Sequence, residues 1–200
     1  MSEVAPLARP LPRVVVGERL RLEVWGADRV DEVRDLVERS QATLSAFLPW
    51  ATEVPTTAEE AAAQASAEQR WREGRMAGWI VLEDGEVRGM LGLHRRGGPD
   101  ELEIGYWLDA AATGRGLMTQ ACTMATDVAF GVEGIDAVEI IHDRANRRSE
   151  GVPARLGYRR VAAFTADVTA RGESGVKVRW RVRRAEWLAR GLPTAVLSTE

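Results

Sequence analysis

The sequence predicts one α/β domain of the α+β kind, with a mixed, mostly antiparallel sheet of about seven strands and helices on both of its faces. Two observations lead to this class. Segments of alternating hydrophobicity are interspersed with segments at helical spacing, and three consecutive strand patterns fill the middle of the chain. The 200 residues, 45% of them hydrophobic, suit one domain with a buried core, and the chain shows no internal repeat.

The first half of the chain predicts one strand, two helices and a three-stranded meander. Leu20, Leu22 and Val24 alternate with charged residues, as in a half-buried strand. The stretch TTAEEAAAQASAEQRWREG has acidic residues early and arginines late, as the helix dipole favours. Asp84-Gly85 between two strand patterns predicts a hairpin. In order, we expect a strand over 19–25, helices over 27–40 and 56–74, and strands over 77–83, 86–94 and 101–108.

The second half predicts two further helices and three further strands. Leu117, Ala121 and Met124 form an apolar stripe at helical spacing, and Gly157 ends a short helical pattern. In order, we expect a helix over 116–130, a strand over 137–142, a helix over 149–157, and strands over 158–168 and 176–182. The last 18 residues start as a helix.

The ends of the chain and its composition limit the class of protein. We expect a flexible lead-in over 1–13, which holds three prolines, a single domain over 14–190 and a frayed tail over 191–200. The net charge of −3 and the scattered arginines argue against nucleic-acid binding. The chain has no signal-peptide core and no apolar run as long as a membrane span, so we expect a cytoplasmic protein that binds no membrane. One cysteine and two histidines argue against a metal site.

A glycine turn leads directly into the helix predicted at 116–130. Gly114 and Gly116 let a ligand approach the backbone, and the first amides of a helix have no internal partner, so a phosphate is the expected guest. The turn is not a Walker A loop. It also lacks the last glycine of a dinucleotide fingerprint, where Thr119 stands. From these residues alone, a glycine-rich helix start without a ligand stays an equal alternative.

The surrounding motifs are more specific. EIGYWLDAAATGRGLMTQA, followed about 30 residues later by NRRSEGVPARLGYRRV, resembles the GNAT acyltransferase superfamily, and within it the RimJ/RimL group of protein N-terminal acetyltransferases. The resemblance spans about residues 17–187 and includes the order of the predicted elements. One departure is Thr113, which stands where the family usually has Gln or Arg to wrap a diphosphate.

The resemblance implies acetyl-CoA as the co-substrate. In this fold the amides of the glycine turn hold the pyrophosphate, and Arg115 adds charge at its rim. The strand that ends at Leu108 parts from the next strand, and the pantetheine arm lies in the split, where Asn146 bonds it. The alternative for Trp107 is simple core packing. The expected donor-binding residues are Tyr106, Trp107, Leu108, Thr113, Gly114, Arg115, Gly116, Leu117, Met118, Thr119, Asn146 and Ser149.

Two residues are candidates for proton transfer. Glu103 shares a strand face with Trp107, and the resemblance places a general base there; the alternative is a solvated carboxylate. Many superfamily members use a tyrosine acid at the position of Pro153, which excludes it here and leaves Ser149 as the acid that the group's motif implies. Ser149 is also a candidate helix N-cap, and both roles can hold together.

The acceptor side is less specific. The segment FLPWA resembles the group's acceptor-lining segment, so Trp50 either shapes the substrate pocket or anchors a helix. His94 either faces the acceptor cleft or is structural. The acidic stretch 53–60 either lines a groove for a protein tail or starts a helix. The acceptor amine is therefore a protein N-terminus, such as a ribosomal one, or a small amine.

Two alternative functions and a dimer stay open. His94, Arg95 and Arg96 could hold the second carboxylate of a larger acyl donor such as succinyl-CoA. A non-catalytic CoA-binding module is the other alternative. The resemblance favours a homodimer, to which Trp79, Trp180 and Trp187 could contribute contact surface. Cys122 lies on the apolar stripe of its helix and is expected to be inert.

Overall fold

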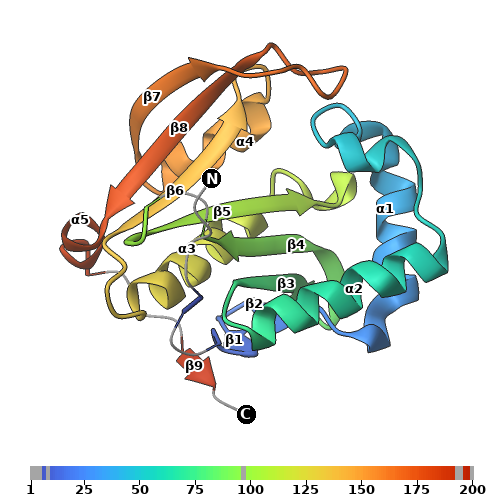
Figure 1. The fold of residues 1–200 in the computed structure, drawn as a ribbon, viewed down its shortest axis with the longest axis horizontal. Coiled ribbons are helices and arrows are strands. Elements are labelled where there is room, and N and C mark those ends of the chain that lie inside the picture. The colour runs from blue at the N-terminus through green and yellow to red at the C-terminus, as the bar shows by residue number, and fades with distance from the viewer. Residues whose placement is uncertain (1–5, 8–9, 96–97, 192–195, 199–200) are drawn as a thin grey trace.

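The sheet forms the centre of the molecule in the computed structural model, which describes residues 6–7, 10–95, 98–191 and 196–198 (Figure 1). Among the described residues, nine strands follow the order β7-β8-β6-β5-β4-β3-β2-β1-β9, in which β5 and β6 pair in parallel. The strands are β1 (Val14–Val16), β2 (Leu20–Val24), β3 (Met76–Glu83), β4 (Glu86–His94), β5 (Glu101–Leu108), β6 (Ala137–Asp143), β7 (Arg159–Thr165), β8 (Val176–Arg183) and β9 (Val196–Ser198).

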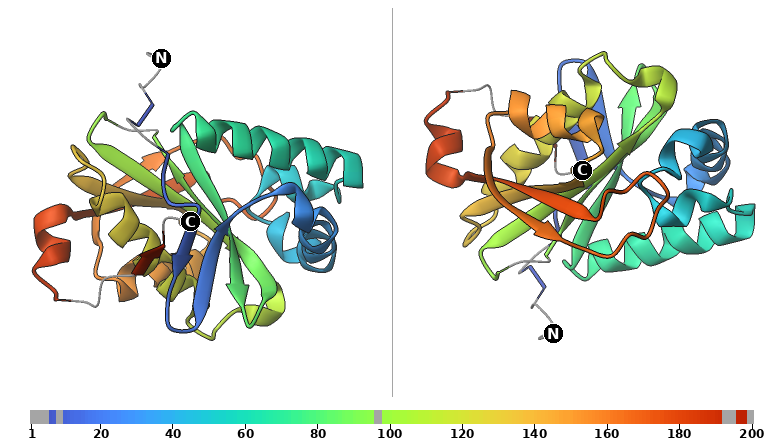
Figure 2. Two further views of the ribbon diagram at one scale, coloured as in Figure 1. Left: turned by 90° about the horizontal axis from the view of Figure 1, so that it is seen from below. Right: turned by 90° about the horizontal axis from the view of Figure 1, so that it is seen from above.

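Helices cover both faces of the sheet, as the sequence predicts (Figure 2). On one face, the buried residues of α3 pack with Leu91, Leu102 and Ile104 in the larger core. On the other face, Val33 and Leu36 of α1 pack with Ile80 of β3 in a second, smaller core. The helices are α1 (Val30–Leu44), α2 (Thr57–Arg72), α3 (Leu117–Phe130), α4 (Arg147–Arg155) and α5 (Arg184–Leu188), with short 3-10 turns η1 (Ala27–Arg29), η2 (Pro49–Thr52) and η3 (Ala110–Ala112).

All seven predicted strands are present, and the predicted hairpin at Asp84-Gly85 is confirmed. Both turn residues have positive φ, 52° and 83°, as a tight hairpin between twisted strands requires. Two further strands, β1 and β9, were not predicted; they pair with each other at the edge of the sheet. Each has only three residues, which is too short for a periodic pattern.

Two expectations concern the chain ends. Residues 1–5 and 8–9 of the predicted lead-in, and residues 192–195 and 199–200 of the predicted tail, lie outside the described residues. Within the described ranges, every helix is too short or too polar to span a bilayer.

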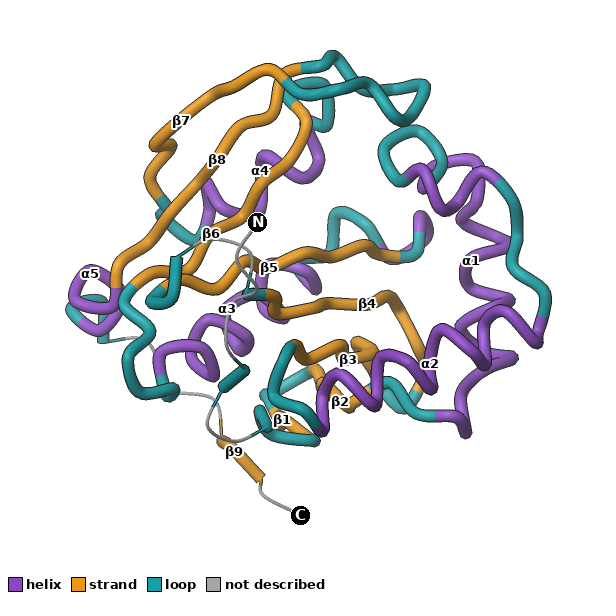
Figure 3. The backbone as a smooth tube through the Cα atoms, viewed as in Figure 1, coloured by secondary structure: helices purple, strands orange, loops and turns teal. Residues whose placement is uncertain are grey.

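The sheet opens where β5 and β6 diverge. Their ladder pairs Glu101–Ile104 with Ala137–Ile140 and goes no further among the described residues. Beyond it, 105–108 stay paired with β4, whereas 141–143 stay paired with β8. The tube in Figure 3 shows β6 and β8 diverging from β5 beyond the paired residues. The wedge between β5 and β6 is the predicted split, and α3 and α4 start beside it.

Candidate active site

The glycine turn before α3 is open to a ligand. Gly114 and Gly116 both have φ of 79°, and a Cβ on either would meet nothing within 4 Å. The first helical hydrogen bond runs from the Gln120 amide to the Gly116 carbonyl. The amides of 117–119 therefore lie ahead of the helical ladder, at the positive end of the helix dipole. This combination of open space and amide donors makes an anion cradle.

The Thr113 side chain stabilises the turn before α3. Its hydroxyl donates to the Ala110 carbonyl at 2.8 Å, so its hydrogen is directed into η3. Asp109 holds the start of the same turn, because its Oδ1 accepts from the Ala111 amide at 3.1 Å. Asp109 is buried and also accepts from Ser40 of α1 at 3.3 Å. The cradle is thus fastened to a helix on the opposite face of the sheet.

Arg115 lies between the two cradle glycines, and its guanidinium forms an ion pair with Glu83. The Glu83 carboxylate is 5% exposed and lies 2.8 Å from Arg115, 3.2 Å from Arg19 and 3.4 Å from Arg88. Three guanidinium groups surround this one carboxylate, and Arg88 also pairs with Glu86. The sequence predicts the charge of Arg115 but not the role of Glu83, because Glu83 ends a strand that carries no distinguishing pattern.

Ser149 and Tyr106 meet across the split. The Tyr106 hydroxyl lies 3.0 Å from the Ser149 carbonyl oxygen and 2.9 Å from Ser149 Oγ. The carbonyl only accepts, so it takes the tyrosine hydrogen, and Ser149 Oγ then donates to the tyrosine oxygen. Pro153 explains why the carbonyl is available: four residues further along α4, it has no N–H to donate to Ser149. The pair fixes the rotamer of the Ser149 hydroxyl.

The N-cap alternative for Ser149 is wrong. The cap of α4 is Asn146, whose Oδ1 accepts from the Ser149 amide at 3.1 Å, so Ser149 is the third helical residue. This cap also explains why α4 starts at Arg147 rather than at the predicted 149. The Ser149 side chain is consequently free of capping and faces Tyr106.

Burial controls the protonation of the groups behind the split. It raises the pKa of Tyr106 far above the usual range of tyrosine, so this hydroxyl keeps its proton at physiological pH. Burial also raises the pKa of the Cys122 thiol, which is fully covered inside α3. A buried thiol that stays protonated is a poor nucleophile, in line with the inert role expected for Cys122.

Glu103, His94 and Trp107 share the face of the sheet opposite the larger core. The register places Glu103 directly between His94 on β4 and Glu139 on β6. Gly92 and Gly105 form the next cross-strand pair, and both lie under the His94 ring, with Nε2 at 2.7 Å and 3.6 Å from an added Cβ. The glycine pair leaves the ring room to lie along the sheet.

Trp50 joins the same face from η2. Its ring centroid lies 6.0 Å from that of Trp107 at a tilt of 57°, and half of Trp50 is exposed (51%). Trp107 also packs against the second core, so the predicted core contact is present. The two indoles thus pack together on the sheet face that Glu103 shares.

A hairpin loop closes the far side of this face. In Figure 1 the tip of the β7–β8 hairpin reaches the end of α1. The Gly172 amide donates to the Ala46 carbonyl at 2.8 Å, and Arg171 donates to the Ala42 carbonyl at 3.0 Å. A Cβ at Gly172 would lie 2.6 Å from the Ala46 oxygen, so this close approach needs glycine. The sequence carries no local signal for this contact.

Comparisons with known proteins agree with this geometry. Residues 19–159 match the model of the family described as "Acetyltransferase (GNAT) domain". The chain belongs to the GNAT acetyltransferase family. Membership makes it an acyl-CoA-dependent N-acetyltransferase, as the sequence predicts.

The relatives point to the RimJ/RimL-like group. The chain is 28% identical over 150 residues to the "Putative ribosomal N-acetyltransferase YdaF" of Bacillus subtilis (strain 168), covering 72% of this chain and 79% of the relative. RimL, a ribosomal L7/L12 alpha-N-protein acetyltransferase solved with coenzyme A, superposes with a TM-score of 0.79 at 19% identity over 85% of this chain and 97% of RimL. Mycobacterium smegmatis RimJ, solved with a CoA-disulfide, gives 0.76 at 22% identity over 93% and 88%.

Several expectations about this GNAT chain need correction. Glu59 forms a capping box with Thr56, and Glu60 is buried, so helix start is the role that the structure gives to this part of the acidic stretch. Trp79 and Trp187 are buried in the larger core and offer no surface to a dimer partner. Arg95 donates to the Pro99 carbonyl of its own loop, and Arg96 lies outside the described residues.

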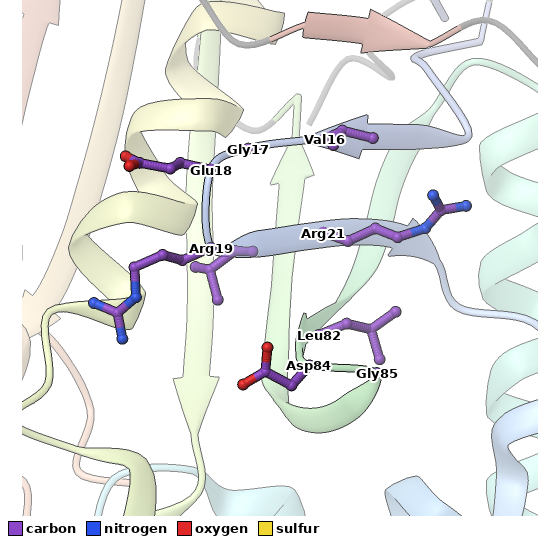
Figure 4. Close-up of a pocket in the computed structure, with 9 residues that line it drawn as sticks. Val16, Gly17, Glu18, Arg19, Arg21, Leu82, Asp84 and Gly85 are labelled. Carbon is purple, nitrogen blue, oxygen red and sulfur yellow. The ribbon is translucent and has the colours of Figure 1, made fainter.

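A surface hollow of about 220 Å³ lies next to the arginines around Glu83, with Arg19 in its lining (Figure 4). It is formed by the β1–β2 turn and the β3–β4 hairpin, and none of the candidate site residues lines it. Among the described residues we find no cluster of three or more groups that could hold a metal ion.

Proposed function

We propose that this enzyme transfers an acetyl group from acetyl-CoA to the N-terminal amine of a protein, with a ribosomal protein as the acceptor class. The single observation that carries the proposal is the open cradle beside a split sheet whose two sides present Ser149 and Glu103. The acceptor class is taken from the relatives, which are named as ribosomal N-acetyltransferases. A single domain over 14–190, a cytoplasmic location and a homodimer stay predictions.

The donor side fits a CoA diphosphate. The space beside Gly114 and Gly116 would be filled by any Cβ, and the amides of 117–119 have no partner within α3. The Arg115 guanidinium, although paired with Glu83, adds a cation at the rim of this cradle. The unpaired edges of 105–108 and 141–143 offer backbone groups to the pantetheine amides. Acetyl-CoA supplies the thioester, and this chain supplies its orientation.

The acceptor amine must lose a proton to react. Glu103 is the base: it takes the proton from the ammonium or through one water, which leaves the nitrogen lone pair free to form the new C–N bond. As the C–S bond breaks, the electron pair leaves on sulfur, Ser149 gives its hydroxyl proton to that thiolate, and the second proton lost by the acylated nitrogen passes through water to the serine oxygen and restores its hydroxyl. Tyr106 then donates to the serine oxygen in place of the carbonyl, which stabilises the charge left on it.

Trp50 and Trp107 form the proposed wall of the acceptor site, with His94 at its floor. The hairpin loop and the end of α1 bound the same space. Residues of η2, β4 and β5, the hairpin loop and the end of α1 therefore determine which amine fits.

The test is acetyl transfer with a panel of acceptors, read by mass spectrometry. Peptides that start with Ser, Ala or Met, N-terminally blocked copies of them, polyamines and an aminoglycoside are offered with acetyl-CoA. We expect one acetyl group on the free α-amine of a peptide and none on the blocked copy. Acetylation of small amines alone would contradict the acceptor class, and faster transfer from succinyl-CoA would contradict the acetyl donor. Binding of CoA without turnover would favour the non-catalytic module.

A further inference from the structure

The C-terminal end of α4 places a cation beside the cradle. Arg155 is the last residue of α4, and its Nε donates to Thr119 Oγ1 at 3.2 Å. Thr119 is the third residue of α3, and its amide belongs to the cradle. Arg155 is exposed, and no described residue pairs a carboxylate with it. Its charge is therefore available to a ligand.

Gly151 makes room for this arrangement. The Arg155 side chain folds back over α4, and a Cβ at Gly151 would lie 2.8 Å from its Nη1. The guanidinium is also close enough to Tyr106 to lower the pKa of that hydroxyl slightly, against the larger effect of burial. Arg155 consequently lies between the cradle and the split, on the path from a bound diphosphate to the pantetheine arm.

The two other side chains next to the cradle that could contact a diphosphate already bond to protein groups. Thr113, at the position where the family has Gln or Arg, directs its hydroxyl into η3. Arg115 is drawn toward Glu83 at 2.8 Å. A diphosphate in the cradle thus needs a cation from another element.

We propose that Arg155 is a donor-binding residue that contacts the diphosphate of CoA and supplies the charge that Thr113 lacks. This inference rests on the proposed function for the identity of the donor. Guanidinium groups match phosphate oxygens with two parallel hydrogen bonds, and Nη1 and Nη2 of Arg155 are the nitrogens left for them.

The test compares Arg155→Gln with the matched control Arg72→Gln. Arg72 is likewise the last residue of its helix and is exposed, so both variants lose the same charge from the same helical position. Three donors are used: acetyl-CoA, acetyl-dephospho-CoA, which keeps the diphosphate, and S-acetyl-pantetheine, which has no phosphate.

We expect Arg155→Gln to raise the KM for acetyl-CoA and acetyl-dephospho-CoA about tenfold with kcat within twofold. Turnover of S-acetyl-pantetheine and all properties of Arg72→Gln should match wild type. An unchanged KM for acetyl-CoA would overturn the inference, as would an equal loss with S-acetyl-pantetheine. An effect that disappears with acetyl-dephospho-CoA would assign Arg155 to the 3′-phosphate and also overturn it.

A second variant and a binding measurement cover two failures. If Arg155→Gln does not fold, Gly151→Ala moves the guanidinium without removing it, and we expect a several-fold rise in the same KM. If wild type turns over none of the donors, calorimetry with CoA and pantetheine still tests Arg155. Weaker CoA binding by the variant, with pantetheine unaffected, would then support the inference while the proposed function fails.

Discussion

The donor side and the acceptor side of this site are built differently. The donor side lies within one stretch of about 50 residues, from Tyr106 to Arg155, and most of it is backbone: cradle amides, two glycines and the open edges of β5 and β6. The acceptor side gathers side chains from η2, β4 and β5 and from a hairpin whose contact with α1 joins residues 129 positions apart. The difference teaches that donor recognition is encoded locally, whereas acceptor selection depends on the tertiary fold.

The most direct test of this difference is to remove the proposed base. Glu103→Gln keeps the shape of the side chain but cannot accept the proton, so we expect kcat to fall by about 10²–10³-fold. Glu101→Gln is the control, because Glu101 lies on the same strand face and is bound to Arg181 at 2.7 Å. Steady-state kinetics with acetyl-CoA and a peptide measure both. A Glu103→Gln enzyme within threefold of wild type would show that the base lies elsewhere.

The next effect in size comes from the side chains behind the split. Ser149→Ala removes the acid and should lower kcat by about 10–100-fold with little change in the KM for acetyl-CoA. Tyr106→Phe should lower kcat less, because the serine keeps its proton but loses its fixed rotamer. If the two residues act as a unit, the double variant loses no more than Ser149→Ala alone. Additive losses in the rates would contradict that coupling.

The cradle itself can be tested by the same substitution at two matched glycines. Gly116 and Gly134 share a φ of 79° and open space around an added Cβ, but Gly134 lies in the turn after α3, away from the cradle. We expect Gly116→Ala and Gly134→Ala to cost about 1 kcal/mol of stability each, since both force alanine into the left-handed region. Only Gly116→Ala should also raise the KM for acetyl-CoA, about tenfold. Equal KM values in both variants would place the diphosphate elsewhere.

The smallest effect on turnover concerns the hairpin loop on the acceptor side. Burial pushes the pKa of Glu173 up, but hydrogen bonds from Lys177, Thr169 and Ala170 outweigh it and lower the pKa to about 2. A lowered folded-state pKa gives stability that is present above the unfolded value near 4.5 and is lost as pH falls toward 2. We expect wild type to lose at most about 2 kcal/mol of stability between pH 7 and pH 3, and less where water screens the carboxylate. Urea unfolding of wild type and Glu173→Gln at pH 7 and pH 3 measures it, and parallel losses in both proteins would refute the assignment.

The backbone features of the proposed donor side are easier to predict from sequence than those of the proposed acceptor side, for physical reasons. Alternation along 101–108 correctly placed Glu103 and Trp107 on one face and Tyr106 on the other. Gly114 and Gly116 indicated the proposed cradle, because residues with positive φ just before a helix have few roles other than opening the backbone to a ligand. These signals depend on the backbone within a few residues, which a sequence shows directly.

Other features could not be predicted, because they depend on neighbours distant in sequence. The Tyr106–Ser149 pair joins residues 43 positions apart, and Pro153 was interpreted only as a missing tyrosine, not as the residue that frees a carbonyl. Glu83 attracts three arginines that no short pattern links to it. The cap at Asn146 was visible in the sequence, but Ser149 is an equally good cap by residue type, and only the backbone separates them.

The pairing of β1 with β9 has a consequence for synthesis on the ribosome. The outer edge of β1 carries three consecutive valines and is matched by Val196–Ser198, which is translated about 180 residues later. Until that segment leaves the exit tunnel, the nascent sheet presents an apolar edge with unpaired amides, the kind of template on which chains aggregate. The strand β9, made about 180 residues after β1, thus covers the edge that β1 would otherwise expose.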